Sequence, residues 1–189
     1  MLDVSCIDAA KAGKNDTLCE LAGRRNGRAA RDGPEGLVVK LGSDQLVLDT
    51  NILVHWLRGK DAGTKLRTDY ALGSRAPRPI LPLVVKAETK SLALQFGWGA
   101  DRQKALDELL RELPNAEISS ERVISAYARL DQASRKLGRK IGKNDLWIAA
   151  VAAVQGAVIL TTDKDIDDLH PTLVRVERIE VASLVAAGN

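Results

Sequence analysis

The sequence has few of the residues that build covalent cross-links or transition-metal sites. Its 189 residues include only two cysteines and two histidines. Both cysteines, Cys6 and Cys19, lie near the N-terminus, so no disulfide framework is expected and a reducing cytoplasm is the expected compartment. A zinc site is not expected either, because such sites usually need about three or four Cys or His ligands.

Long apolar runs are also absent. The longest candidate, residues 146–160, is interrupted by Gln155 and Gly156, whereas a membrane span needs roughly 18 or more apolar residues. Residues 1–17 lack the charged-then-apolar order of a secretory signal. No membrane partner is therefore expected. Aromatic residues make up 3% of the chain, which argues against a broad platform for base stacking.

The overall composition is that of a folded protein. Apolar residues make up 45% and charged residues 28%, which is typical of a globular domain. The formal net charge is +3, which permits a nucleic-acid partner without requiring one.

The chain divides into two parts. Residues 1–44 are rich in Gly, Arg, Asn and Asp and show no sustained apolar period, so we interpret them as a poorly ordered N-terminal extension or the product of a mis-assigned start codon. Residues 45–189 show regular patterns and are predicted to form one domain.

In that domain, predicted strands alternate with predicted helices. The strands are 45–49, 79–81, 116–119, 157–162 and 174–180, and the helices are 50–59, 61–72, 83–99, 102–113, 121–138 and 144–156. Thr50 is expected to cap the first helix and Gly59 to end it. This alternation predicts a three-layer α/β/α fold with a mostly parallel central sheet of four to five strands.

Four acidic residues follow strands or begin helices in this pattern. Asp49 ends the first strand, Asp163 follows a late strand, and Glu88 and Asp145 lie near helix starts. The carboxyl ends of parallel strands share one rim, so these side chains are expected to meet there. Two such charges about 4 Å apart repel by roughly 4 kcal/mol at an effective dielectric near 20. A cation would relieve that repulsion, and oxygen ligands without His or Cys favour Mg²⁺ or Mn²⁺.

Each acid also has a structural interpretation when it is taken alone. Asp49 could close a turn, Asp145 could interact with a helix dipole, Glu88 could face solvent, and Asp163 could cap a turn. The four together favour a metal site, and a hydrated Mg²⁺ suits phosphodiester cleavage.

Three segments carry a family resemblance. Residues 46–59 (LVLDTNILVHWLRG), 84–91 (VVKAETKS) and 143–169 (KNDLWIAAVAAVQGAVILTTDKDIDDL) resemble, in this order, the PIN domain and most closely the VapC-type toxins of bacterial toxin–antitoxin pairs. The resemblance covers roughly residues 45–181. The first and third segments are highly specific, whereas the match around Glu88 is weaker.

The resemblance implies a PIN-like fold and a magnesium-dependent endoribonuclease that hydrolyses RNA with a metal-activated water. The catalytic and metal-binding quartet would be Asp49, Glu88, Asp145 and Asp163, with Asp49 and Asp145 as the most direct ligands. Supporting positions would be Asn51, Thr161, Thr162 and Asp165, of which Asp165 is a second candidate for the fourth acid. A cognate antitoxin and a homodimer are also implied. The N-terminal extension departs from the family pattern.

A basic stretch precedes Asp145. It contains Arg135, Lys136, Arg139, Lys140 and Lys143, with no acid between Asp131 and Asp145. It is either a solvated helix end or a track for RNA phosphates.

Two other functions remain open from the sequence. A housekeeping PIN nuclease and a non-catalytic RNA-binding PIN module share the same fold, although the presence of all four acids argues against loss of catalysis. A phosphotransfer domain with an aspartate nucleophile lacks a second acid beside Asp49.

Overall fold

Strand β1 (Leu46–Leu48) forms the centre of the sheet because all three of its side chains are apolar and fully buried. It pairs in parallel with β4 (Val158–Thr161), and β4 pairs in parallel with β5 (Arg175–Arg178). Burial of β1 and β4 on both faces is typical of a parallel sheet covered by helices.

Two short strands extend this sheet beyond β1. Strand β2 (Leu81–Pro82) pairs in parallel with β3 (Asn115–Ala116). Ile80 joins them to β1, since its N–H donates to Leu46 O at 2.7 Å and its carbonyl accepts from Leu48 N at 3.1 Å. The spatial order is therefore β3-β2-β1-β4-β5, and the order reverses between β1 and β4. Ligands bind at such a reversal in open α/β sheets.

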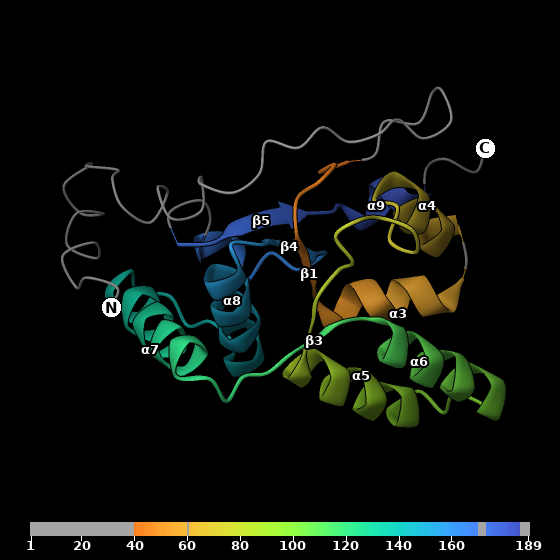
Figure 1. The fold of residues 1–189 in the computed structure, drawn as a ribbon, viewed down its shortest axis with the longest axis horizontal. Helices are drawn as coiled ribbons and strands as arrows, with labels where there is room; N and C mark the ends of the chain where they lie inside the picture. The colour runs from red at the N-terminus through yellow and green to blue at the C-terminus, as the bar shows by residue number, and fades with distance from the viewer. Residues whose placement is uncertain (1–39, 60, 170–172, 186–189) are drawn as a thin grey trace.

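The computed structural model describes residues 40–59, 61–169 and 173–185. Its helices are α3 (Thr50–Arg58), α4 (Asp61–Asp69), α5 (Leu83–Gln95), α6 (Ala100–Glu112), α7 (Glu121–Lys136), α8 (Lys143–Gln155) and α9 (Val181–Val185), with a short 3₁₀ turn, η1 (Asp167–Leu169). In Figure 1, α7 and α8 lie on one side of the strands and α3, α4 and α9 on the other, with α5 and α6 below α3. The three-layer α/β/α arrangement predicted from the sequence is confirmed.

Helix α8 is the central helix of the domain. Its buried residues are Leu146, Ile148, Ala149, Ala150, Val151 and Ala152. It packs against α7, α5, β1 and β4, which explains why its sequence is apolar on nearly all sides.

Several predicted boundaries were wrong. Asp49, not Thr50, is the N-cap of α3, because the Asp49 carboxylate accepts a hydrogen bond from the Thr50 backbone. Helix α4 ends at Asp69 because the backbone turns at Ala71, whose φ is 49°. The third strand is shorter and begins one residue earlier than predicted, and α9 was not predicted at all.

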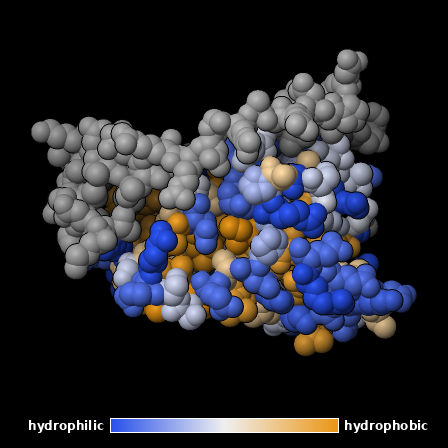
Figure 2. All heavy atoms as spheres, in the orientation of Figure 1, coloured by the Kyte–Doolittle hydropathy of each residue, from blue (hydrophilic) through white to orange (hydrophobic). Residues whose placement is uncertain are grey.

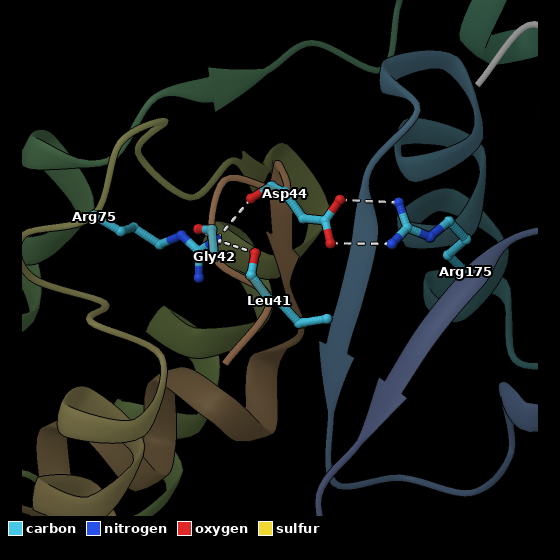
Figure 3. A network of polar contacts seen from close by, with 5 residues as sticks. All are labelled: Leu41, Gly42, Asp44, Arg75 and Arg175. Atoms are coloured by element: carbon cyan, nitrogen blue, oxygen red, sulfur yellow. Dashed lines mark hydrogen bonds and ion pairs between the residues drawn. The ribbon is translucent and has the colours of Figure 1, made fainter. Parts of the chain in front are cut away.

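Residues 40–44 are held against the domain by a buried arginine (Figure 3). The Arg75 guanidinium donates to the backbone carbonyls of Leu41, Gly42 and Asp44 at 2.7–3.2 Å, and its other terminal nitrogen donates to the Tyr70 carbonyl at 3.0 Å. The Asp44 carboxylate also pairs with both terminal nitrogens of Arg175, at 3.1 Å each. These contacts connect the segment before β1 to the loop between α4 and β2 and to strand β5.

Some sequence expectations concern residues that the structure does not describe. Cys6, Cys19 and most of the predicted extension lie within residues 1–39, so the predicted domain boundary remains a prediction. In the described ranges, no helix has the length and apolar content that a bilayer crossing requires. The face drawn in Figure 2 carries mostly hydrophilic residues over α6, with hydrophobic residues visible near its middle.

Candidate active site

Asp49 lies where β1 ends and α3 begins, and it is only 6% exposed. One carboxylate oxygen accepts from Thr50 N at 2.6 Å. The other accepts from Asn51 Nδ2 at 2.7 Å and from Thr161 Oγ1 at 2.6 Å. Burial raises the pKa of Asp49, the three hydrogen bonds oppose that rise, and the charge of Glu88 adds to it. The carboxylate is therefore fixed in position inside the protein.

Asn51 and Thr161 connect the ends of the two central strands. Asn51 donates to Asp49 and its Oδ1 accepts from the backbone N–H of Thr162 at 3.0 Å. The Thr161 hydroxyl donates to Asp49 and accepts from Asp163 N at 2.9 Å. Both residues thus orient the Asp49 carboxylate, whereas Thr162 contributes its backbone N–H.

Glu88 reaches the same region from helix α5. Its Oε2 accepts a 2.6 Å hydrogen bond from the hydroxyl of Thr50, the first residue of α3. Glu88 lies in the second turn of α5, and this contact brings its carboxylate next to Thr50, the residue that follows Asp49. Sequence reasoning did not identify Thr50 as the partner of Glu88.

Asp145 lies in the first turn of α8 and is partly exposed. Its carboxylate comes so close to Gly142, the N-cap, that a Cβ atom there would lie 2.5 Å from Asp145 Oδ2. Burial raises the pKa of Asp145 to about 6, and the charges of the other acids around it add to the rise. These acids are, in decreasing order of effect, Asp49, Asp163, Glu88 and Asp165.

Asp163 and Asp165 occupy the loop after β4. Both are exposed, and Asp163 Oδ1 accepts from the backbone N–H of Asp165 at 3.0 Å. Asp163 faces the same cleft as the three other acids, whereas Asp165 lies outside the cleft lining. This placement favours Asp163 over Asp165 as the fourth acid.

One open cleft of about 340 Å³ brings these side chains together. That space has room for roughly ten waters at about 30 Å³ each. It is lined by Asp49, Thr50, Asn51, Val54, His55, Arg58, Glu88, Leu92, Phe96, Asp145 and Asp163. All four acids of the predicted quartet therefore share one cleft at the carboxyl ends of β1 and β4.

The acids of the cleft do not form a complete set of protein ligands for one metal ion. Within residues 40–59, 61–169 and 173–185, no three acidic, histidine or cysteine side chains are arranged to bind one ion by themselves. Mg²⁺ does not require such a group, because proteins usually hold it through one or two carboxylates and several waters. The oxygen donors of the cleft and the mutual repulsion at Asp145 fit a hydrated Mg²⁺ or Mn²⁺.

The basic stretch ends at Lys143, the first residue of α8, two residues before Asp145, and its members are not among the residues that line the cleft. Two of its members pair with Asp131, Arg135 at 3.1 Å and Lys143 at 3.4 Å. Lys136 and Lys140 are exposed. The solvated and RNA-binding interpretations of this stretch therefore both remain open, with part of its charge neutralised within the protein.

Several residues in or beside the cleft were not identified from the sequence. Gly142 could be found only from its close approach to Asp145. His55 lines the cleft, and its burial, together with the smaller effect of the Arg58 charge, lowers its pKa. Arg58 and Phe96, which also line the cleft, were not identified as site residues from the sequence.

Comparison with known proteins identifies relatives of this chain. The chain is 30% identical over 115 residues to a protein named Ribonuclease VapC1 from Haemophilus influenzae strain R2866, covering 61% of this chain and 84% of the relative. A protein of the same name from strain ATCC 51907 is 29% identical over the same length.

Solved structures share the fold. The VapBC2 structure from Rickettsia felis, bound to a DNA fragment from its promoter, has a TM-score of 0.61 at 23% identity over 71% of this chain and 98% of that one. VapBC-5 from Mycobacterium tuberculosis, a member of a family of toxin–antitoxin systems, has a TM-score of 0.56 at 26% identity over 72% of this chain and 99% of that one. The family model described as PIN domain matches residues 46–170. The chain belongs to the PIN-domain family.

Proposed function

We propose that this protein is a divalent-metal-dependent endoribonuclease and the toxin of a toxin–antitoxin pair. The observation that carries the proposal is the single cleft that is lined by Asp49, Glu88, Asp145 and Asp163. Their mutual repulsion contributes to the pKa of about 6 at Asp145. A fold that holds uncompensated acids together at a strand rim is explained by a cation that binds there.

The proposed cation is Mg²⁺, with Mn²⁺ as a chemically similar substitute. Asp49 and Asp145 would be its most direct ligands, and Glu88 and Asp163 would complete the acidic surroundings. When bound, the cation would polarise the phosphate and lower the pKa of a water molecule.

The chain's own residues prepare the cleft for that cation. The hydroxyl of Thr161 and the amide of Asn51 donate to the Asp49 carboxylate, which favours its ionised form and fixes its orientation. The hydroxyl of Thr50 donates to Glu88 and fixes the orientation of that carboxylate. Gly142 leaves the space that the Asp145 carboxylate occupies. The acids themselves would repel RNA, so the substrate needs positive groups at the border of the cleft.

The RNA substrate is proposed from two sources. The relatives at 29–30% identity are named ribonucleases, and the basic stretch from Arg135 to Lys143 lies just before Asp145. Exposed Lys136 and Lys140 offer positive charge for RNA phosphates. Recognition would then depend on the backbone and shape of the RNA.

The toxin role is proposed from the solved VapBC structures, one of which is described as a member of a family of toxin–antitoxin systems. A cognate antitoxin would bind this protein and suppress its activity. The homodimer implied by the resemblance and the cytoplasmic location remain predictions. Expression of the protein in bacteria should arrest growth, and co-expression of a neighbouring gene product should relieve the arrest. Normal growth during expression of active enzyme would instead favour a housekeeping nuclease.

Cleavage of total cellular RNA by purified full-length protein tests the activity. We expect cleavage with Mg²⁺, no cleavage with a chelator, and recovery when excess Mg²⁺ is added back. Asp49→Asn should abolish cleavage, whereas Asp101→Asn, an exposed acid on α6, should leave it intact. Full activity of the Asp49→Asn variant, or cleavage that survives chelation, would refute the proposal. RNA binding without cleavage in every metal would identify a non-catalytic binding module.

A further inference from the structure

The cleft extends beyond the four acids along two helices. On α3, its lining residues Asn51, His55 and Arg58 recur every three to four positions, and on α5 so do Glu88 and Leu92, with Phe96 one turn later at the C-cap. Residues with this spacing share one face of a helix, and α3 and α5 pack against each other. The cleft therefore runs about two helical turns, on the order of 10 Å, away from the acids.

Arg58 and Phe96 form the far end of this cleft. The Arg58 guanidinium carbon lies 5.3 Å from the centroid of the Phe96 ring, which is cation–π geometry. Both residues are exposed, Phe96 to 49%. Throughout the described part of the chain, no carboxylate forms an ion pair with Arg58, although four acids line the same cleft.

This arrangement has a chemical consequence. An arginine that is held by a ring instead of a carboxylate keeps its N–H donors available for an anion. A guanidinium matches a phosphate with two parallel hydrogen bonds. The half-exposed ring, in turn, is apolar surface that a nucleic-acid base can cover by stacking.

We propose that Arg58, positioned by Phe96, binds a phosphate of the RNA that flanks the cleavage site, so that the substrate lies along the cleft between α3 and α5. This inference rests on the proposed ribonuclease function and assigns part of its substrate site. Arg58 lies about two turns of α3 away from the acids. The phosphate that it binds is therefore not the phosphate held at the acids. Arg58 binds a neighbouring nucleotide and sets how much single-stranded RNA the enzyme requires on that side.

RNA binding without cleavage is the first test. A fluorescently labelled single-stranded oligonucleotide is titrated with full-length protein in chelator, and anisotropy is measured at several salt concentrations. Arg58→Gln should weaken binding about tenfold, the loss of one charge-assisted contact, and should reduce the salt slope by about 0.7, the value for one phosphate contact on a single strand. Arg58→Lys should restore the slope but only part of the affinity. Arg122→Gln, an exposed arginine on α7 outside the cleft lining, is the matched control and should change neither quantity.

Cleavage of a ladder of oligonucleotides is the second test. As nucleotides are added on either side of the cleaved bond, kcat/KM of the wild type should rise in one step. This step should be absent in Arg58→Gln, mainly because the variant no longer lowers its KM for the longer oligonucleotide, whereas kcat should change less. Phe96→Leu, which keeps an apolar side chain but removes the ring, should reduce the same step.

The outcomes separate the two proposals. A wild type that cleaves no RNA in Mg²⁺ contradicts the ribonuclease function. A wild type that cleaves, together with an Arg58→Gln variant of unchanged salt slope and unchanged length dependence, overturns only the role of Arg58. Because both Arg58 and Phe96 are exposed, these substitutions are not expected to unfold the protein.

Discussion

The hydroxyl of Thr161 donates a 2.6 Å hydrogen bond to Oδ2 of Asp49 across the two central strands. This contact joins the residue that ends β4 to the acid that follows β1, and it is fully buried on the Thr161 side. It opposes the rise in the pKa of Asp49 that burial causes, and it therefore favours the ionised form that a cation binds.

Thr161→Val removes that donor while it keeps the shape of the side chain. The pKa of Asp49 should rise further, because the hydrogen bond that opposes the effect of burial is lost. The apparent affinity for Mg²⁺ should fall at least about tenfold, the usual loss when a residue that orients a metal ligand is removed. A Mg²⁺ titration of RNA cleavage measures this. Thr162→Val is the matched control, since Thr162 contributes its backbone N–H, and equal losses in both variants would refute the assigned role.

Gly142→Ala should disturb the site without removing any acid. The backbone at Gly142, with φ −59° and ψ 148°, accepts alanine, but the new Cβ would displace the Asp145 carboxylate. We expect RNA cleavage to fall by roughly tenfold or more, since small misplacements of a site group are costly, with little change in melting temperature.

A matched control for this substitution exists in the same chain. Gly99 is the N-cap of α6 with a similar backbone, and nothing lies within 4 Å of the position that a Cβ atom would take there. Gly99→Ala should therefore keep full activity. Full activity of Gly142→Ala as well would show that the close contact with Asp145 has no functional consequence.

Stability should depend on pH through Asp145. Its pKa is raised from 3.8 to about 6 in the folded protein, so folding favours the protonated form. The contribution of Asp145 to the stability of the fold is then fully present below about pH 3.8, and it is lost as the pH rises through about 6. Because Asp145 is partly exposed, the loss should be only about 1 kcal/mol after screening by solvent.

Chemical denaturation of wild type and Asp145→Asn in chelator measures this effect. The variant should lack the loss between pH 4 and pH 6 that the pKa values of Asp145 define, and should be more stable than the wild type at pH 7. Added Mg²⁺ should stabilise the wild type and not the variant. A wild type and variant with parallel pH profiles would contradict the proposed repulsion at Asp145.

Arg75→Met should destabilise the protein for a reason unrelated to the cleft, in contrast to the stabilisation predicted for Asp145→Asn. Arg75 is 5% exposed and donates to four backbone carbonyls. In the variant these carbonyls lose a charged hydrogen-bond donor, which should lower the free energy of unfolding by about 3 kcal/mol. Arg78→Met, which removes a more exposed arginine, should cost less than about 1 kcal/mol. Similar values for the two variants in urea unfolding would reject the anchoring role of Arg75.

The sequence predicted the order of strands and helices as far as β5, and it predicted that four acids lie at one rim of the sheet. Apolar runs such as Leu46–Leu48 and the all-round apolar α8 identify buried strands and helices, and parallel topology alone brings the ends of β1 and β4 to one rim. Asp49, Glu88, Asp145 and Asp163 could thus be assigned to one place from the order of strands and helices.

The remaining features depend on distances between elements, which periodicity does not contain. The hydrogen bond from Thr50 to Glu88 requires the packing of α3 on α5, and the role of Gly142 requires the rotamer of Asp145. The N-cap was misassigned because Asp49 and Thr50 are both good capping residues, and only the hydrogen bond to Thr50 N distinguishes them.

The proposed chemistry requires the acids of this cleft to form a divalent-cation site. Calorimetric titration of Mn²⁺ and Mg²⁺ into metal-free full-length protein at neutral pH measures this binding itself, with Asp49→Asn and Asp145→Asn beside the wild type. We predict saturable binding to the wild type that is lost in both variants. Absence of binding to the wild type even in the presence of RNA, or unchanged binding to either variant, would show that the acids do not hold a cation.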